Sequence, residues 1–264
     1  MSMTTVMWIF YIIIFFMGAS VFSFVNVLIY RIPAQMPFGN ERSICPACKH
    51  VLNGYDMIPV FSYLILGGRC RFCKVKISVR YPLVEVLGGG LAVFSFYWFG
   101  KLEDGSLEGI LRAVLVFVLL AVLTAISFID IDTLEIPNGL VIAVLSCGLV
   151  SIVLFPELGI VPRIIGALAI SLPMMILALV IAGAFGGGDI KLMAAAGLFL
   201  GWRCVIVAFL VAVLTGGIYG IYLLASKKKD RKGQFAFGPF LCVGIAAAVF
   251  AGESIIQWYM GFLI

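Results

Sequence analysis

The sequence predicts an all-α membrane protein with about eight transmembrane helices and one polar loop domain after the first helix. Hydrophobic residues make up 63% of the 264 residues, and charged residues only 12%. The hydrophobic residues form runs close to the ~20 residues that an α-helix needs to cross about 30 Å of hydrocarbon. The one sizeable polar segment, 31–80, follows the first run. These observations are typical of a polytopic membrane protein.

The apolar runs define the expected helices in chain order. They lie at 6–30, 81–100, 110–129, 138–155, 163–184, 190–201, 204–225 and 236–261. The first is too long for the core of a signal peptide, and no convincing cleavage site follows it, so we expect a retained span. The weakest run is 190–201, because about 12 residues of helix reach only ~18 Å, and a re-entrant segment is the alternative there. We therefore divide the chain into a first transmembrane helix at 1–30, a loop domain at 31–80 and a membrane-embedded helix bundle at 81–264.

Basic residues lie on one side of the predicted bundle. Segment 31–80 holds eight Lys and Arg residues against two acids, and the run KKKDRK at 227–232 adds five more. Because basic loops favour the cytoplasmic side, we expect both segments to be cytoplasmic, with the acidic loops around 101–109 and 156–162 outside. A re-entrant 190–201 would place KKKDRK outside, so we favour a crossing element there. The net charge of +5 is thus explained by topology and lipid contacts, and no nucleic-acid motif is present.

Two C-x-x-C pairs in the loop domain predict a zinc site. They are CPAC at 45–48 and CRFC at 70–73, so the candidate ligands are Cys45, Cys48, Cys70 and Cys73. Four thiolates complete a tetrahedral, coordinatively closed site, which is typical of structural zinc. A loop of about 50 residues needs such a staple, because it is too small for a large core. A reducing compartment counts against disulfides, and a metal-free redox pair is the alternative.

The other histidine and cysteine residues have simpler explanations. His50 is the only histidine and lies beside the first pair, but with four cysteines available we expect a surface residue. Cys147, Cys204 and Cys242 lie inside apolar runs, where a small thiol is an ordinary packing residue.

Few acidic residues lie near the apolar runs. They are Glu85, Asp130, Asp132, Asp189 and Glu253. Asp130 and Asp132 end the third run in SFIDIDTLEIPNG, and Asp189 follows FGGG at the start of the sixth. The expected topology puts these three at cytoplasmic helix ends, at one depth. Two adjacent carboxylates can share a proton, so that one activates water and the other donates to the peptide carbonyl. The pattern therefore indicates an aspartic protease.

The helix ends suggest how the aspartates differ. Asp189 lies at an N-terminal, partially positive end and Asp130 at a C-terminal one, so we expect Asp189 to ionise more easily. Asp130 and Asp132 are about 200° apart around a helix, so only one of them can easily face Asp189. The glycines at 186–188 allow close approach of a neighbour or substrate, with plain helix punctuation as the alternative.

The order of motifs resembles the type IV prepilin peptidases, also called leader peptidase/N-methyltransferases. The matching stretches are GASVFSFVNVLIYRIP, CPAC, IPVFSYLILGGRC, CRFC, RYPLVE, IDIDTLEIPN, GGGDIKLMAAAG and FAFGPFL, and they run nearly from end to end. The resemblance implies that Asp130 and Asp189 are the catalytic pair, rather than Asp132. One departure is Asn138, where many members of the family have Asp, and we expect little consequence from it.

The resemblance also implies two reactions at a bacterial inner membrane. The first is cleavage of the short basic leader of type IV prepilins or type II secretion pseudopilins, after a glycine at the cytoplasmic face. The second is N-methylation of the new N-terminus with S-adenosylmethionine, assigned to the cysteine domain with its flanking helices. The sequence has no G-x-G-type cofactor loop for it. Glu85 is either a polar contributor there or a structural partner for a basic residue, and Glu253 is expected to be a bundle or interface acid.

Three other functions remain open at this stage. A peptidase without methyl transfer would use the cysteine loop for substrate docking. A proton-coupled transporter would use Asp130, Asp132 and Asp189 as a relay, but the outer halves of the runs are nearly free of ionisable residues. A zinc-bearing scaffold without activity would leave the aspartates unexplained.

Overall fold

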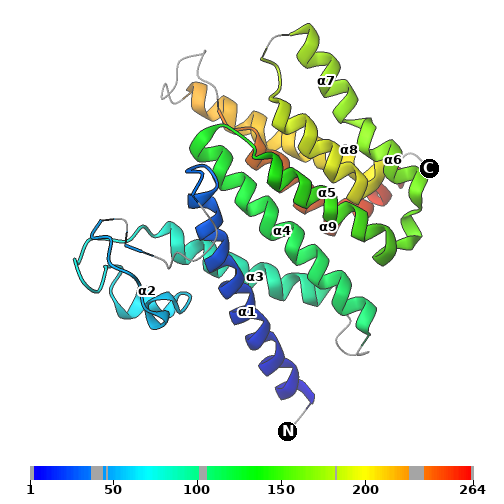
Figure 1. Ribbon diagram of the computed structural model, residues 1–264. Coiled ribbons are helices and arrows are strands. Elements are labelled where there is room, and N and C mark those ends of the chain that lie inside the picture. The colour runs from blue at the N-terminus through cyan, green and yellow to red at the C-terminus, as the bar shows by residue number, and fades with distance from the viewer. Residues whose placement is uncertain are drawn as a thin grey trace. The chain divides into compact units, whose positions relative to one another are not determined.

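The computed structural model describes residues 3–36, 44–45, 47–100, 106–181, 183–225 and 235–262. Its elements are α1 (Met3–Arg31), η1 (Gly54–Met57), α2 (Phe61–Ile65), α3 (Arg80–Phe99), α4 (Leu107–Thr133), α5 (Asn138–Leu154), η2 (Pro156–Leu158), α6 (Ile160–Ala169), α7 (Ser171–Val180), α8 (Gly187–Ala225) and α9 (Gly238–Met260) (Figure 1). Within these residues the only β pairing is two isolated bridges. The all-α prediction is confirmed.

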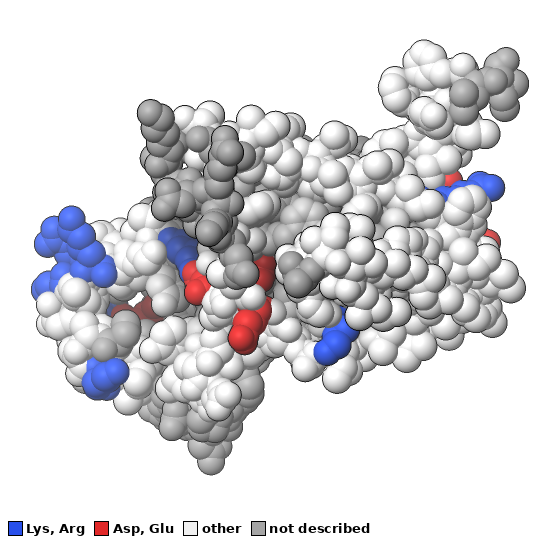
Figure 2. Space-filling view, turned by 90° about the horizontal axis from the view of Figure 1, so that it is seen from above, with Lys and Arg blue, Asp and Glu red and all other residues white. Residues whose placement is uncertain are grey.

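Each predicted apolar run lies on helix, but the number of spans differs from about eight. Six stretches in the described residues are long and apolar enough to cross a membrane. They are Thr5–Arg31, Arg80–Phe99, Leu107–Thr133, Ile160–Val180, Gly187–Leu223 and Gly238–Met260. The difference has two causes: α5 has only 17 residues, and the runs 190–201 and 204–225 are two helices that meet at a kink within α8. The face seen in Figure 2 is correspondingly poor in charged side chains.

Two of the helical stretches are interrupted. In α8, Gly201 has φ 73 and ψ 171, which is not helical. This break separates the predicted runs 190–201 and 204–225, and only glycine adopts a positive φ without strain. The predicted run 163–184 is interrupted at Ile170, between α6 and α7. The first part of α8, from Gly187 to the break, is roughly 22 Å long, too short to span the hydrocarbon alone.

The chain forms two compact units, Met1–Phe117 and Val118–Ile264. In the first unit α1 packs against α3 through small residues. A Cβ at Gly18 would lie 2.5 Å from Ala92 Cβ, and a side chain at Gly88 would overlap the Phe22 ring. The first unit therefore holds the loop domain between two closely packed helices. The division at residues 30 and 80 stays a prediction.

The second unit contains a buried arginine that the sequence analysis did not single out. The guanidinium of Arg163, at the start of α6, donates hydrogen bonds to the Ser151 hydroxyl and to the carbonyls of Ser151, Phe155, Leu198 and Phe199. These carbonyls lie at the C-terminal end of α5 and just before the break in α8. Arg163 thereby satisfies carbonyls that a helix end leaves without partners. It joins the ends of α5 and of the first part of α8.

Candidate active site and metal centre

Asp130 lies in the last turn of α4 and is held by the start of α9. Its side chain is buried, and its Oδ2 accepts a hydrogen bond of 2.9 Å from the backbone N–H of Gly238. Gly238 is the first residue of α9, so this N–H has no partner within its own helix. A Cβ at Gly238 would lie 2.6 Å from the same carboxylate oxygen. The glycine of FAFGPFL is therefore required for the carboxylate to approach the backbone.

Asp189 lies in the first turn of α8 and caps that helix. Its Oδ2 accepts a hydrogen bond of 3.2 Å from the backbone N–H of Gly186, three residues earlier. This is the reciprocal half of a capping box, in which an acid in the first turn bonds back to the residue before the helix. A Cβ at Gly188 would lie 2.8 Å from Ile136 Cβ. Close approach therefore explains Gly188, whereas Gly187 faces open space.

The structure brings Asp130 and Asp189 close enough to interact electrostatically. Asp132 is exposed. Cys242, one turn after Gly238, is buried within electrostatic range of both Asp130 and Asp189. The predicted packing thiol thus lies beside the two carboxylates. The backbone N–H of Gly238 was missed by sequence reasoning, because no side-chain pattern reveals a backbone donor.

The helix ends no longer separate the two acids as the sequence analysis expected. Asp189 lies at the N-terminal end of α8, as predicted. Asp130 lies at the C-terminal end of α4, which is partially negative. It also lies at the N-terminal end of α9, whose partial positive charge opposes the charge of the α4 end. Each carboxylate accepts one backbone N–H. The easier ionisation of Asp189 stays a prediction.

Lys191 links the first turn of α8 to the first turn of α5. Its Nζ donates a hydrogen bond of 3.0 Å to Oδ1 of Asn138. Both side chains are exposed. Asn138, the departure from the family pattern, therefore has a defined partner close to Asp189 in sequence.

The four predicted cysteine ligands come together in the first unit. The sulfur atoms of Cys45, Cys48, Cys70 and Cys73 all lie within 4.8 Å of one another, and the cluster could hold a metal ion. Each C-x-x-C pair lies in a turn closed by an isolated bridge, Ile44 with Val51 and Arg69 with Lys76. The residue after each pair, Lys49 or Lys74, has φ 59. The two turns are therefore built alike.

Backbone N–H groups in these turns donate hydrogen bonds to the sulfur of Cys70. Hydrogen bonds from the backbone N–H groups of Cys73 and Phe72 lower the pKa of Cys70 to about 7. The thiolate is thereby favoured at Cys70, whereas burial and hydrogen bonds with the other cysteines raise the pKa of Cys73 to about 11. His50 is exposed and its ring lies 3.5 Å from that of Phe72 by centroids. The exposure confirms the expected surface position.

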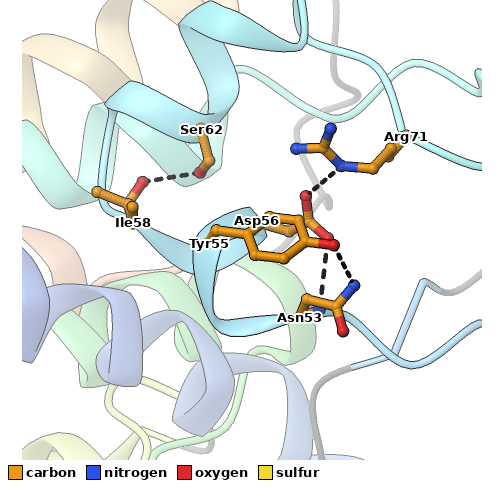
Figure 3. Close-up of polar contacts among 6 residues, drawn as sticks. All are labelled: Asn53, Tyr55, Asp56, Ile58, Ser62 and Arg71. Carbon is orange, nitrogen blue, oxygen red and sulfur yellow. Dashed lines mark hydrogen bonds and ion pairs between the residues drawn. The ribbon is translucent and has the colours of Figure 1, made fainter.

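An ion pair joins the segment between the turns to the second turn. Arg71 Nε donates to Asp56 Oδ1 at 2.7 Å, and the Asn53 backbone N–H donates to Asp56 Oδ2 at 3.3 Å (Figure 3). Asn53 Nδ2 also donates to the Tyr55 hydroxyl at 2.7 Å. The Asp56 side chain is only 2% exposed, so this pair lies in a partly dry site.

The two remaining acids have structural partners. Glu85 Oε2 accepts a hydrogen bond of 2.8 Å from the Val60 backbone N–H, rather than from a basic side chain. Glu253 accepts a contact of 3.7 Å from the Cys204 thiol. This contact joins α9 to α8, so Glu253 is a bundle acid as predicted.

Comparison with known proteins identifies the family. The profile described as the bacterial peptidase A24 N-terminal domain matches residues 16–99, and that of the type IV leader peptidase family matches residues 117–221. The prepilin leader peptidase/N-methyltransferase of Aeromonas salmonicida (strain A449) is 33% identical over 283 residues, covering 96% of this chain and 94% of the relative. The protein of that name from Legionella pneumophila is 33% identical over 285 residues, covering 97% and 96%. The one from Bacillus subtilis (strain 168) is 32% identical over 248 residues, covering 94% and 97%. No solved structure matches the chain. The chain belongs to the type IV leader peptidase family.

Proposed function

We propose that this chain is a membrane enzyme that removes the leader peptide of type IV prepilins and pseudopilins and then methylates the new N-terminus. The observation that most supports cleavage is the approach of Asp130 and Asp189 from the ends of two different helices. The names of relatives at 32–33% identity support both reactions. The apolar helices support an integral protein of the bacterial inner membrane.

In the proposed cleavage, Asp130 and Asp189 act as one unit that shares a proton. The ionised carboxylate takes a proton from a water molecule as the oxygen of that water attacks the peptide carbonyl carbon. The protonated one donates to the carbonyl oxygen, and the leaving nitrogen is protonated as the C–N bond breaks. The N–H groups of Gly238 and Gly186 orient the two carboxylates.

We infer that the active site faces the cytoplasm. The basic residues of 31–80 support this side. The run KKKDRK at 227–232 supports it too, but lies outside the described residues. A prepilin would approach laterally from the lipid, since its cleavage point adjoins a hydrophobic helix. Its basic leader would then lie on the aqueous side.

Methyl transfer would use S-adenosylmethionine as its second substrate. The new terminal amine attacks the methyl carbon, the bond from that carbon to sulfur breaks, and the nitrogen loses one proton. We assign this step to the loop domain with its flanking helices, because the profile of the bacterial peptidase A24 N-terminal domain covers residues 16–99. No residue is assigned to the methyl donor.

We propose that Cys45, Cys48, Cys70 and Cys73 bind a structural zinc ion. With Zn–S bonds of about 2.3 Å, a tetrahedral site needs sulfur separations of about 3.8 Å. The separation between Cys45 and Cys73 is 3.9 Å. Four thiolates leave no open position, so the ion would hold the two turns together and take no part in either reaction.

Mass spectrometry of a prepilin incubated with the protein in lipid vesicles and S-adenosylmethionine tests this proposal. We expect Asp130→Asn and Asp189→Asn to abolish cleavage and Asp132→Asn, the matched control, to retain it. The wild-type product should carry the mass of one added methyl group. Cleavage that survives in Asp130→Asn or Asp189→Asn would refute the catalytic pair. A cleaved but unmethylated product would leave a peptidase alone.

A further inference from the structure

The segment 58–66, IPVFSYLIL, exposes large apolar side chains within the loop domain. The exposed fractions are 48% for Ile58, 47% for Phe61, 67% for Leu64 and 79% for Ile65. The segment includes α2 and lies between the two cysteine turns in sequence. A contiguous apolar patch of this kind marks an interaction site rather than a surface that faces water.

Contact with α1 places this segment at the depth of the hydrocarbon. The Phe61 ring stacks on that of Phe16, with centroids 5.5 Å apart and an interplanar angle of 25°. Figure 1 shows α2 beside α1. Fifteen residues separate Phe16 from Arg31, the basic end of α1, which is roughly 22 Å along the axis. Val60 also contacts Glu85, five residues or roughly 8 Å along α3 from Arg80, so the segment lies between these two levels, within a hydrocarbon layer of about 30 Å.

Three polar groups of the segment have partners within the protein, as a lipid environment requires. The Ser62 hydroxyl donates to the Ile58 carbonyl at 2.7 Å (Figure 3). The Tyr63 hydroxyl donates to the Ile77 carbonyl at 3.4 Å. The backbone N–H of Val60 donates to Glu85 Oε2 on α3. The segment therefore needs no water for these groups.

A tight turn at Val60 directs the chain into this position. Val60 has φ 65 and ψ −51, and the Phe61 N–H donates to the Pro59 carbonyl at 2.6 Å. These values describe a classic γ-turn, which is strained for a β-branched residue. Such strain persists only where the surroundings hold it. Glu85 and Phe16 supply two contacts that hold the turn against the helix pair.

We propose that segment 58–66 is a re-entrant element whose apolar face contacts the acyl chains of the bilayer. The exposed face of α1 at Ile12, Ile13 and Met17 supplies neighbouring lipid-facing surface at the same depth. Arg69 follows the segment and suits a phosphate headgroup. Lipid is therefore the occupant that fits both the depth and the charge. A second copy or a prepilin helix is a distinguishable alternative.

Photo-crosslinking in full-length protein tests the proposal. A benzoylphenylalanine replaces Ile65 in one variant, Leu64 in a second and Val75, on the second cysteine turn, in a control. Each protein is placed in vesicles of one phospholipid, and a thermal unfolding transition like that of the wild type verifies that it is folded. We expect a phospholipid adduct at Ile65 and Leu64 and its absence at Val75.

Two results would overturn it. One is the absence of lipid adduct at both Ile65 and Leu64 in folded protein, which would place the segment in water. The other is an adduct that joins two copies of the chain, or the chain and added prepilin, in place of the lipid adduct. The proposal does not depend on catalysis, so loss of cleavage in the aspartate variants would leave it unaffected.

Discussion

The cysteine cluster of the first unit and the aspartate pair of the second are held together in opposite ways. The cluster joins four side chains from two short turns, each closed by its own backbone. The aspartates are held by backbone N–H groups, and Gly238 is 108 positions from Asp130. A site built from side chains is lost when one side chain is lost. A site held by backbone N–H groups is instead sensitive to substitution of the glycines that supply them, although these have no side chain.

The largest expected effect is removal of a cysteine ligand. Cys70→Ser should abolish zinc binding, because structural zinc contributes on the order of 10 kcal/mol to the folding of small domains. We expect the loop domain to lose protection in hydrogen exchange and methyl transfer to disappear, while cleavage in the second unit remains measurable. Metal analysis and the prepilin assay check this.

The control is Cys147→Ser, which changes a buried thiol of α5 outside the cluster. It should keep a full complement of zinc. Full zinc content in Cys70→Ser would show that the cluster does not depend on each side chain.

Arg163 tests how far the second unit depends on backbone contacts. Arg163→Met removes the donors to four carbonyls at the ends of α5 and the first part of α8. Each buried acceptor left without a partner costs about 1–3 kcal/mol, partly relieved by repacking, so we expect a loss of roughly 3–4 kcal/mol in unfolding free energy. Thermal unfolding in detergent measures it.

The matched change is Arg203→Met, at an exposed arginine that lies over the Trp202 ring. Its effect should stay below about 1 kcal/mol. Equal losses of unfolding free energy in the two variants would mean that the buried hydrogen bonds of Arg163 do not contribute to stability.

Gly238→Ala should damage the aspartate site without removing any functional side chain. The new Cβ would lie 2.6 Å from Asp130 Oδ2, so the carboxylate must shift. A misplacement of about 1 Å costs up to 10²-fold in rate, and we expect kcat to fall roughly 10- to 100-fold with little change in KM. Gly217→Ala is the control, because its Cβ would meet nothing within 4 Å. Wild-type kcat in Gly238→Ala would contradict the role of this contact.

The helices were largely predictable from the sequence, because the apolar runs have the length and continuity of membrane spans. The break at Gly201, where two helices of α8 meet at a kink, lies at the predicted boundary between the runs 190–201 and 204–225. Six long stretches stand in place of about eight runs, because composition does not show that α5 has only 17 residues or that two helices meet at a kink within α8. The packing of segment 58–66 was not foreseen, because no sequence pattern reveals the contacts of Phe61 with Phe16 and of Val60 with Glu85.

The cysteine cluster and the aspartate pair also differ in how far the sequence predicts them. Cysteine spacing predicted the cluster directly, because both members of each pair lie in one turn. The approach of Asp130 and Asp189 required an argument from depth and a family resemblance. Gly238 and Arg163 were missed, since their partners are backbone groups of distant helices.

The smallest expected effect is that of Asn138→Asp. This substitution changes a contact between two exposed side chains, in which no backbone group takes part. The Lys191 ammonium, 3.0 Å from Oδ1, would gain an ion pair, and the new charge would also lie in the first turn of α5. An exposed pair contributes about 0.2–1 kcal/mol and is screened by salt, so a small rise in thermal stability should disappear at high ionic strength. Asn138→Ala, the comparison variant, should lose stability by a similar amount at all salt concentrations. Cleavage should be unchanged in both, because the contact lies outside the carboxylate pair. A changed cleavage rate in Asn138→Asp alone would mean that the charge of Lys191 acts on Asp189, and the aspartate site would then depend on side chains as well as on backbone.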